Sequence, residues 1–365
     1  MGILHRVFGR RVAEVWAAEQ RIMHRLGVVA PPVAVQWIST SRCDLTCPHC
    51  YSNAGAATRG ELTTEQAVTR LLDELVRLDR PIFVIAGGES TLRQDFDTII
   101  RETHRRQIPW AIHTHGGLVH RHAKTFEDCP PSMAAVSLDG PRDFHDAFRG
   151  RPGGYDKALS AMAFLKDCGV QEVVAGTTIN RLNADRLGEM LPAVLASRAD
   201  SWGFHLMTPE GRAGENRELL PTAAQLRRTA SLARRLRSMM HVELDNEWGS
   251  AGRDDCFYRD EPFTCGAGRV SCVVSATGEL MPCTTTDHGE SAGNILDTPL
   301  SELWASGFGR FRDGKDPLRG DLFDCWLNTR HGVSCRQAAF TADLFDDALT
   351  THGATRVPLT IGGAR

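Results

Sequence analysis

The stretch Val33–Tyr51, VAVQWISTSRCDLTCPHCY, joins a β-rich run to a loop with three cysteines. Val33–Ser39 is typical of a strand, because β-branched and aromatic residues dominate it. Cys43, Cys47 and Cys50 follow so closely that one loop is able to wrap one metal centre. Three thiolates leave the fourth iron of a 4Fe–4S cube without a protein ligand, and a cofactor can bind there. A structural zinc site with His49 as its fourth ligand is the alternative that the spacing leaves open.

Short β-rich runs alternate with helical patterns after this point. The expected strands are Val33–Ser39, Pro81–Ala86, Trp110–Thr114, Ala134–Leu138, Glu172–Ile179 and Trp202–Met207. The expected helices are 63–78, 92–106, 155–168, 184–197 and 222–239, and Thr63 with Gln66 predicts a capping box for the first. This alternation predicts a parallel sheet with right-handed crossovers. We therefore expect an α/β fold, a partial (β/α)6 TIM barrel, with its ligand site at the C-terminal ends of the strands.

The pattern changes after about residue 245. Arg269–Ser275 and Glu279–Cys283 predict a β-hairpin around a turn at 276–278, and a short helix is expected near 299–312. We predict four regions: an N-terminal amphipathic helix within 1–32, the barrel at 33–245, a smaller C-terminal hairpin and helix domain at 246–345, and a tail at 346–365.

Composition indicates a soluble globular protein. The chain has 365 residues, a formal net charge of -3 and 24% charged residues, and it contains no apolar run of the roughly 18 residues that a membrane span needs. The N-terminus carries no export signal, so we expect a cytoplasmic protein without membrane or nucleic-acid partners. Eleven cysteines in such a chain favour metal ligands over disulfides.

The first cysteine cluster and three later motifs resemble those of the radical S-adenosylmethionine (SAM) superfamily. The motifs are C-x3-C-x2-C followed by an aromatic residue, Gly87-Gly88-Glu89-Ser90, Val136-Ser137-Leu138-Asp139-Gly140, and His145-Asp146-x-x-Arg149-Gly150. They occur in order along residues 33–215. Two departures are present: Ser90 stands where the family usually has Pro, and Thr114-His115-Gly116 stands where relatives often have Thr-Asn-Gly.

The resemblance implies a function and a set of roles. Cys43, Cys47 and Cys50 would hold a 4Fe–4S cluster that cleaves SAM reductively to a 5′-deoxyadenosyl radical, which abstracts hydrogen from the substrate. Gly87, Gly88 and Glu89 would receive the methionine amino group of SAM. Ser137 and Asp139 would contact the ribose, and Arg149 would pair with the SAM carboxylate.

A second cysteine group, Cys265, Cys272 and Cys283, resembles the SPASM or twitch extension of radical SAM maturases and dehydrogenases, a match that covers about 265–335. These three cysteines and a downstream one, Cys335 in preference to Cys325, would hold one auxiliary 4Fe–4S cluster. A second auxiliary cluster is not expected, because only Cys256 and Cys325 remain in the region. Cys129 and Cys168 are interpreted as small buried residues.

The expected activity is that of a radical SAM oxidoreductase or maturase that modifies a ribosomally synthesised peptide by crosslinking, dehydrogenation or epimerisation. A dehydrogenase or epimerase acting on a sugar, an aminocyclitol or another small metabolite is the alternative, and a non-enzymatic Fe–S or zinc module is the third. Thr284 counts against sulfatase maturation, because the sulfatase-maturing relatives carry an Asp there. Candidate acid–base residues are His205, Glu210 and Asp287, with none preferred. Expected partners are an electron donor such as flavodoxin or ferredoxin and a separate peptide-recognition protein.

Overall fold

The computed structural model describes residues 22–23, 26–244, 248, 265–285 and 288–312. Most of the expected N-terminal helix and the whole of the C-terminal tail lie outside these residues. The same holds for Cys256, Cys325 and Cys335 and for the candidate acid–base residue Asp287.

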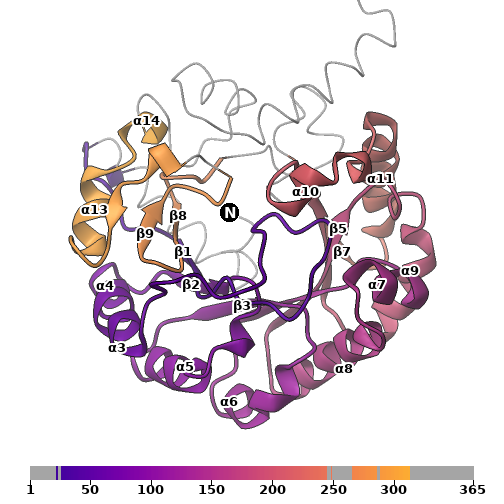
Figure 1. Ribbon diagram of the computed structural model, residues 1–365, viewed down its shortest axis with the longest axis horizontal. Coiled ribbons are helices and arrows are strands. Elements are labelled where there is room, and N and C mark those ends of the chain that lie inside the picture. The colour runs from indigo at the N-terminus through magenta and orange to yellow at the C-terminus, as the bar shows by residue number, and fades with distance from the viewer. Residues whose placement is uncertain (1–21, 24–25, 245–247, 249–264, 286–287, 313–365) are drawn as a thin grey trace, which may run out of the picture.

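One ten-stranded sheet organises the chain, in the order β10-β9-β8-β1-β2-β3-β4-β5-β6-β7. The six expected strands are confirmed as β1 (Ala34–Ile38), β2 (Ile82–Ala86), β3 (Trp110–Thr114), β4 (Met133–Ser137), β5 (Glu172–Ile179) and β6 (Ser201–Leu206). Each pairs in parallel with the next. A seventh parallel strand, β7 (His241–Leu244), was not expected and pairs with β6. In Figure 1 the strands form an arc with helices around its outside, the arrangement of a partial barrel.

The crossover helices follow the expected pattern. The first is one continuous helical segment of α3 (Thr64–Gln66), a π-helical stretch η1 (Ala67–Leu72) and α4 (Asp73–Arg77), and the Thr63–Gln66 capping box is present. The other expected helices are α5 (Phe96–Arg105), α8 (Gly154–Asp167), α9 (Leu187–Ala196) and α11 (Ala223–Leu236). Short helical segments that the sequence did not predict are η2 (Ser90–Leu92), η3 (Val119–His122), α6 (Ala123–Asp128), α7 (Arg142–Arg149), α10 (Arg212–Glu215) and η4 (Arg217–Leu219).

The central strands are largely buried on both faces, as parallel strands covered by helices usually are. All five residues of β2 are buried. Phe83 and Ile85 belong to the large apolar cluster shared with the helices, whereas Val84 packs with Ala111 and Val174 in a small separate cluster. Because side chains alternate along a strand, the small cluster lies on the opposite, inner face of the sheet. This inner core holds the strands together, and their C-terminal ends carry the polar groups described below.

The C-terminal hairpin extends the barrel sheet. β8 (Ser271–Val274) lies parallel to β1, with Cys272 opposite Val35, and β9 (Glu279–Met281) and β10 (Gly293–Asn294) continue outward as antiparallel strands. Two helices follow, α13 (Leu300–Ser306) and α14 (Gly309–Arg312). Ser301 at the start of α13 donates from its backbone N and its Oγ to Glu74 at 3.0 and 2.7 Å, which attaches the hairpin region to the first crossover helix.

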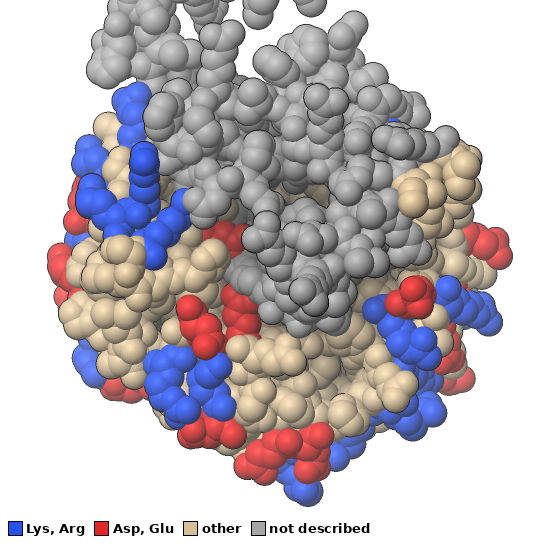
Figure 2. All heavy atoms as spheres, turned by 180° about the vertical axis from the view of Figure 1, so that it is seen from behind, with Lys and Arg blue, Asp and Glu red and all other residues tan. Residues whose placement is uncertain are grey.

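Charges of both signs are spread over the face of the molecule opposite to that of Figure 1. Figure 2 shows basic and acidic side chains interspersed across the described part of that face. No helix within the described residues has the length and apolar character required to cross a bilayer.

Candidate active site

The C-terminal ends of the parallel strands bring the sequence motifs together. The cysteine loop follows β1, Gly87–Glu89 follows β2, Thr114-His115 ends β3, and Ser137–Asp139 ends β4. Neighbouring strands run in the same direction, so these segments lie along one edge of the sheet. The edge is where ligands bind in this class of fold.

Backbone hydrogen bonds shape the cysteine loop. Cys43 N donates to Gly55 O and Gly55 N donates to Ser41 O, both at 2.9 Å, so the two ends of the loop are joined. A turn brings Cys50 N within 3.2 Å of Cys47 O. Cys47 is buried, and Cys43 and Cys50 are half-buried. The loop therefore gathers three thiols at the mouth of the barrel.

The electrostatics of the thiols suit cation binding. The pKa of Cys43 is raised to about 11, mainly by burial and also by the negative charges of Glu89, Cys47 and Asp44, although a backbone hydrogen bond with Leu45 lowers it. Burial also raises the pKa of Cys47, and Arg149 only partly counteracts this effect. Thiolates so disfavoured become stable when a metal centre coordinates them, because metal binding displaces the proton. The donor set therefore fits an iron–sulfur cluster.

A segment after β6 holds the cysteine loop from the opposite side, and the sequence analysis did not identify it. Arg212 Nε donates to Cys47 O at 3.0 Å, its Nη1 donates to Ala54 O at 2.6 Å, and its backbone N donates to Cys50 O at 3.0 Å. Gly211 has φ +53°, and a Cβ there would lie 2.4 Å from Tyr51 O. The close packing requires glycine. The Gly-Arg pair directly after a barrel strand was the available sequence signal.

The glycines of the β2 turn serve its packing against the β1 loop. A Cβ on Gly87 would lie 2.4 Å from Thr40 O, and one on Gly88 would lie 2.3 Å from Arg42 O. Gly88 N donates to Thr40 O at 2.7 Å. The absence of a Cβ at both positions therefore allows the β2 turn to lie directly against the backbone of the β1 loop.

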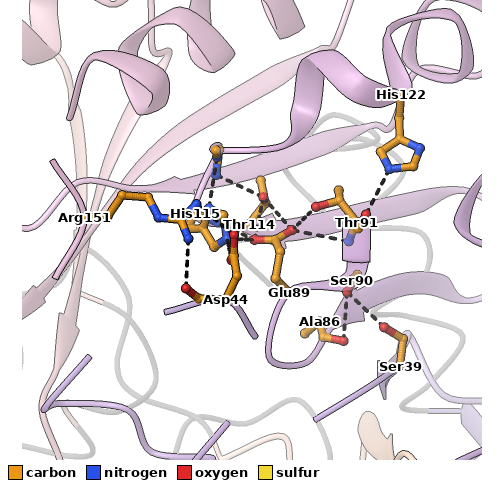
Figure 3. Close-up of polar contacts among 12 residues, drawn as sticks. Ser39, Asp44, Ala86, Glu89, Ser90, Thr91, Thr114, His115, His122 and Arg151 are labelled. Carbon is orange, nitrogen blue, oxygen red and sulfur yellow. Dashed lines mark hydrogen bonds and ion pairs between the residues drawn. The ribbon is translucent and has the colours of Figure 1, made fainter. Parts of the chain in front are cut away.

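Ser90 ties the same turn to the barrel. Its Oγ donates to Ala86 O at 3.0 Å and accepts from Ser39 Oγ at 3.0 Å (Figure 3). The turn is therefore anchored although the usual Pro is absent.

Glu89 is fully buried at the centre of a polar network (Figure 3). Its carboxylate accepts from Thr91 Oγ1 at 2.6 Å, from Thr114 Oγ1 at 2.9 Å and from His115 N at 2.9 Å. The motifs at the ends of β2 and β3 are thus connected through one carboxylate. Fixed donors hold the buried carboxylate in one position. A carboxylate that binds an ammonium ion needs such a defined position.

His115 extends this network to the cysteine loop. Its Nε2 lies 2.9 Å from Asp44 Oδ1 and 3.3 Å from Glu89 Oε2, and Asp44 also pairs with Arg151 at 2.8 Å. Burial lowers the pKa of His115, but the two carboxylates outweigh it, and the net pKa is raised. The hydrogen bond from His115 lowers the pKa of Asp44 well below its usual range. Ligand atoms of Cys43, Asp44 and His115 all lie within 4.8 Å of one another. From the sequence, His115 was identified only as a departure from the Thr-Asn-Gly of relatives, without a role.

Asp139 and Arg149 bind each other in the structure. Arg149 Nε lies 2.7 Å from Asp139 Oδ2, and Thr178 N donates to Asp139 Oδ1 at 2.9 Å. Burial alone would raise the pKa of Asp139, but Arg149 and nearby imidazoles lower it well below its usual range. The resemblance implies contacts of both residues with SAM, and the structure adds that the two side chains form a buried ion pair with each other. Ser137, at the end of β4, is half-buried beside them.

His49 lies beside this ion pair. Its ring stacks on Phe148 with centroids 4.8 Å apart, and its Nε2 lies 3.5 Å from Asp139 Oδ2. Burial lowers the pKa of His49 to about 4. Its Nδ1 is buried without a hydrogen-bond partner in the described part of the chain. An unpartnered polar atom next to the cysteine loop suits a site that receives a polar cofactor.

The second cysteine group surrounds the hairpin. Cys272 is on β8 and 1% exposed, Cys265 precedes the turn into β8, and Cys283 follows β9 with its Sγ 3.4 Å from Thr285 Oγ1. Burial raises the pKa of Cys272 to about 12, so this thiol also favours metal coordination over a free thiolate. The expected fourth ligand, Cys335 or Cys325, lies outside the described residues.

The remaining candidate acid–base residues lie near β6. His205 is within β6, where Gly176 on the adjacent strand leaves room for its ring: a Cβ at residue 176 would be 3.4 Å from His205 Nε2. Glu210 follows β6 and is buried. Their positions place both residues on the side of the barrel that carries Gly211 and Arg212.

Known proteins match the chain over both regions. The model of the radical SAM superfamily matches residues 37–191, and that of SPASM, an iron–sulfur cluster-binding domain, matches residues 265–326. The AdoMet-dependent heme synthase of Oleidesulfovibrio alaskensis is 27% identical over 348 residues, covering 89% of this chain and 88% of that protein. The mycofactocin maturase MftC of Mycolicibacterium smegmatis is 29% identical over 345 residues, covering 86% and 79%.

The fold also has solved counterparts. Streptococcus suis SuiB bound to S-adenosylmethionine superposes with a TM-score of 0.67 at 14% identity, covering 86% of this chain and 77% of that one. The two family matches, together with the motifs at the strand ends, show that the chain is a radical SAM enzyme with a C-terminal SPASM domain, with SAM and 4Fe–4S clusters as its cofactors.

Proposed function

We propose that this enzyme modifies a ribosomally synthesised peptide, either oxidatively by crosslinking or dehydrogenation, or by redox-neutral epimerisation. The observation that carries the proposal is the similarity to the mycofactocin maturases, which are 28–29% identical over 86% of the chain. A maturase is thus similar to this protein over the barrel and the extension together.

The first part of the proposal concerns the radical SAM site. Cys43, Cys47 and Cys50 hold one 4Fe–4S cluster, and with SAM bound this centre supplies reductive cleavage to methionine and a hydrogen-abstracting 5′-deoxyadenosyl group. Glu89, held by Thr114 and His115, accepts the methionine ammonium. The network fixes the carboxylate before the ligand arrives, which reduces the cost of ordering it on binding.

The ribose and carboxylate of SAM would lie towards β4. Ser137 and Asp139 stand at the strand end, and Arg149 is close enough to Cys47 to lower the pKa of that thiol. We propose that Arg149 presents its remaining guanidinium donors to the SAM carboxylate while its Nε stays on Asp139. In this arrangement Asp139 orients Arg149, and the buried pair excludes water from that side of the site.

The second part concerns the extension. Cys265, Cys272, Cys283 and Cys335 would hold one auxiliary 4Fe–4S cluster, which would supply an acceptor for the electron that the substrate radical gives up. β8 pairs directly with β1, the strand that leads into the radical SAM loop. This pairing holds the two cysteine groups in a fixed relation, as electron transfer between substrate and cluster needs. The electron for SAM cleavage would come from a flavodoxin or ferredoxin.

The test uses the full chain reconstituted without oxygen and supplied with SAM and a strong reductant. The candidate substrates are short peptides from reading frames next to the gene, and the readouts are 5′-deoxyadenosine and the mass of the peptide. Peptide-stimulated SAM cleavage with loss of hydrogen from the peptide, or deuterium uptake from D2O for epimerisation, supports the proposal. An unchanged peptide together with unstimulated SAM cleavage contradicts it.

A small metabolite is the second candidate substrate, because AdoMet-dependent heme synthases are 25–27% identical to this chain and cover 84–89% of it. The same assay separates the two classes when a tetrapyrrole and a set of sugars and aminocyclitols are offered in place of the peptide. Stimulation of SAM cleavage by one of these compounds and not by the peptide would favour the metabolite.

A further inference from the structure

Arg312 occupies an unusual position for a charged side chain. It ends α14, and its Nε donates to Gly268 O at 2.8 Å while its Nη1 donates to Gly307 O at 2.9 Å. Its guanidinium lies 4.4 Å from the centroid of the Trp304 ring. All of these partners are neutral, and no ion pair with a carboxylate is recorded for Arg312 among the described residues.

The guanidinium faces the cysteine side of the hairpin. Gly268 belongs to the tight turn between Cys265 and Cys272, in which Gly268 N donates to Ser271 O at 2.9 Å. A Cβ on Gly268 would lie 2.8 Å from Phe308, so the segment that carries Arg312 packs directly on this turn. Arg312 Nη2 is buried and has no hydrogen-bond partner in the described part of the structure. The side chain is thus fixed at the turn with one donor unused.

The guanidinium of Arg312 is partly buried, and it stays protonated near neutral pH as arginine side chains do in proteins. Its hydrogen bond to Gly268 O puts this positive charge on the turn between Cys265 and Cys272. A partly buried cation whose partners are all neutral is stabilised by negative charge placed near it. A 4Fe–4S cluster with four thiolate ligands has a net negative charge, so it would provide that compensation.

We propose that Arg312 is a positioning residue that tunes the auxiliary cluster, its fixed positive charge raising the reduction potential of the centre bound by Cys272. The inference rests on the proposed ligand role of Cys272. Reduction adds one electron and neither forms nor breaks a bond, so the reduced centre is the more negative state and gains more from the cation. A higher potential makes the cluster a better acceptor of an electron from an oxidised substrate, which deepens the proposed oxidative function.

The magnitude follows from Coulomb's law. A unit charge roughly 10 Å away in a medium with an effective dielectric constant of about 20 changes a one-electron equilibrium by about tenfold. Tenfold corresponds to a shift of about 59 mV for a one-electron couple. Loss of the Arg312 charge should lower the potential of the auxiliary cluster by an amount of this order.

The experiment measures that potential by EPR-monitored redox titration. Variants are made in a chain in which Cys43, Cys47 and Cys50 are all replaced by Ala, so that the auxiliary cluster provides the signal. Arg312→Gln removes the charge and keeps a donor for Gly268 O, and Arg312→Lys keeps the charge. Arg310→Gln is the matched control, because Arg310 is on the same helix with a side chain 64% exposed. Iron and sulfide are counted for every variant.

We expect Arg312→Gln to have a lower reduction potential at unchanged iron content. The potentials of Arg312→Lys and Arg310→Gln should be close to that of the parent chain. Equal potentials in all four chains would overturn the proposal. If Arg312→Gln loses its iron, Arg312→Met is measured instead. Loss of iron in both neutral variants would also overturn the proposal, because Arg312 would then be needed for assembly of the cluster. If Cys272→Ala keeps all of its iron, Cys272 is not a cluster ligand, and the proposal for Arg312 is overturned as well. SAM cleavage and substrate modification, measured in chains with the first cysteine group intact, report separately on the proposed function.

Discussion

The buried ion pair between Arg149 and Asp139 makes the substitution Arg149→Met informative. The side chain of Asp139 is fully buried, and that of Arg149 is 10% exposed. After the substitution the carboxylate keeps its bond from Thr178 N and an imidazole at 3.5 Å, but it loses the guanidinium at 2.7 Å. Met fills a similar volume, so the change removes mainly the charge.

The expected cost follows from this geometry. Opposite charges about 3 Å apart attract by roughly 5–6 kcal/mol at an effective dielectric constant of about 20. The variant no longer has to desolvate the guanidinium, which offsets part of the loss, and removal of one partner from a buried pair typically costs about 3–5 kcal/mol. For a cooperative unit of this size the apparent Tm should fall by about 4–10 °C.

The dependence on pH provides a sharper signature. In the wild-type protein the pKa of Asp139 is lowered, so the stability from the pair is present above the ordinary pKa of an Asp and is lost as the pH falls through the lowered value. Without Arg149, burial should raise the pKa of Asp139 instead, and protonation then stabilises the folded variant. The difference in stability between the two proteins should therefore narrow as the pH falls from 8 to about 5.

The assay is thermal unfolding of anaerobically reconstituted protein at both pH values, followed by circular dichroism. Arg142→Met is the matched control, since Arg142 lies on the same helix and pairs with Asp156 at the surface. Its effect should be within about 1 kcal/mol, as for exposed ion pairs in general. If Arg149→Met lowers the Tm no more than this control does, or by the same amount at both pH values, the electrostatic account of the pair is refuted.

Four further outcomes are expected. Replacement of all three cysteines of the first group, Cys43, Cys47 and Cys50, by Ala should abolish 5′-deoxyadenosine formation and leave the iron of the extension in place; continued SAM cleavage would contradict the assignment. Wild-type protein should hold about eight irons, the content of two cubes, and lose about half of them in Cys335→Ala; a content near twelve in Mössbauer and iron analysis would mean a second auxiliary cluster. Gly88→Ala should weaken SAM binding at least about tenfold in equilibrium dialysis, because its Cβ would lie 2.3 Å from Arg42 O. The control Gly188→Ala should bind SAM normally, because a Cβ at residue 188 has no atom within 4 Å. Arg212→Met should speed the loss of iron to a chelator, because the carbonyls of the cysteine loop lose a charged donor worth about 1.5–3 kcal/mol. If iron is lost no faster than from the exposed control Arg217→Met, Arg212 does not stabilise the cysteine loop.

Local patterns were sufficient to predict most of the barrel. The six expected strands and five crossover helices are present because each run carries its own periodicity and boundary signals, such as the Thr63–Gln66 capping box. β7 was missed because its four residues, HVEL, are too few to display a period. The pairing of β8 with β1 was also missed, since the partners are more than two hundred residues apart and no local pattern encodes that register.

The sequence by itself determined the chemistry of this protein: the spacing of Cys43, Cys47 and Cys50 predicts a cluster with an open iron, and the order of the motifs indicates SAM as its partner. Such information is local, because ligands of one centre in one loop are close in the chain. Only the tertiary structure decided which side chains hold the site together. Arg149 on Asp139, His115 between Asp44 and Glu89, and Arg212 on the cysteine loop are contacts between segments that folding alone brings into register. The sequence motifs contain several of these charged residues but do not show which of them contact each other, and their interactions are strong because burial removes the water that would weaken them.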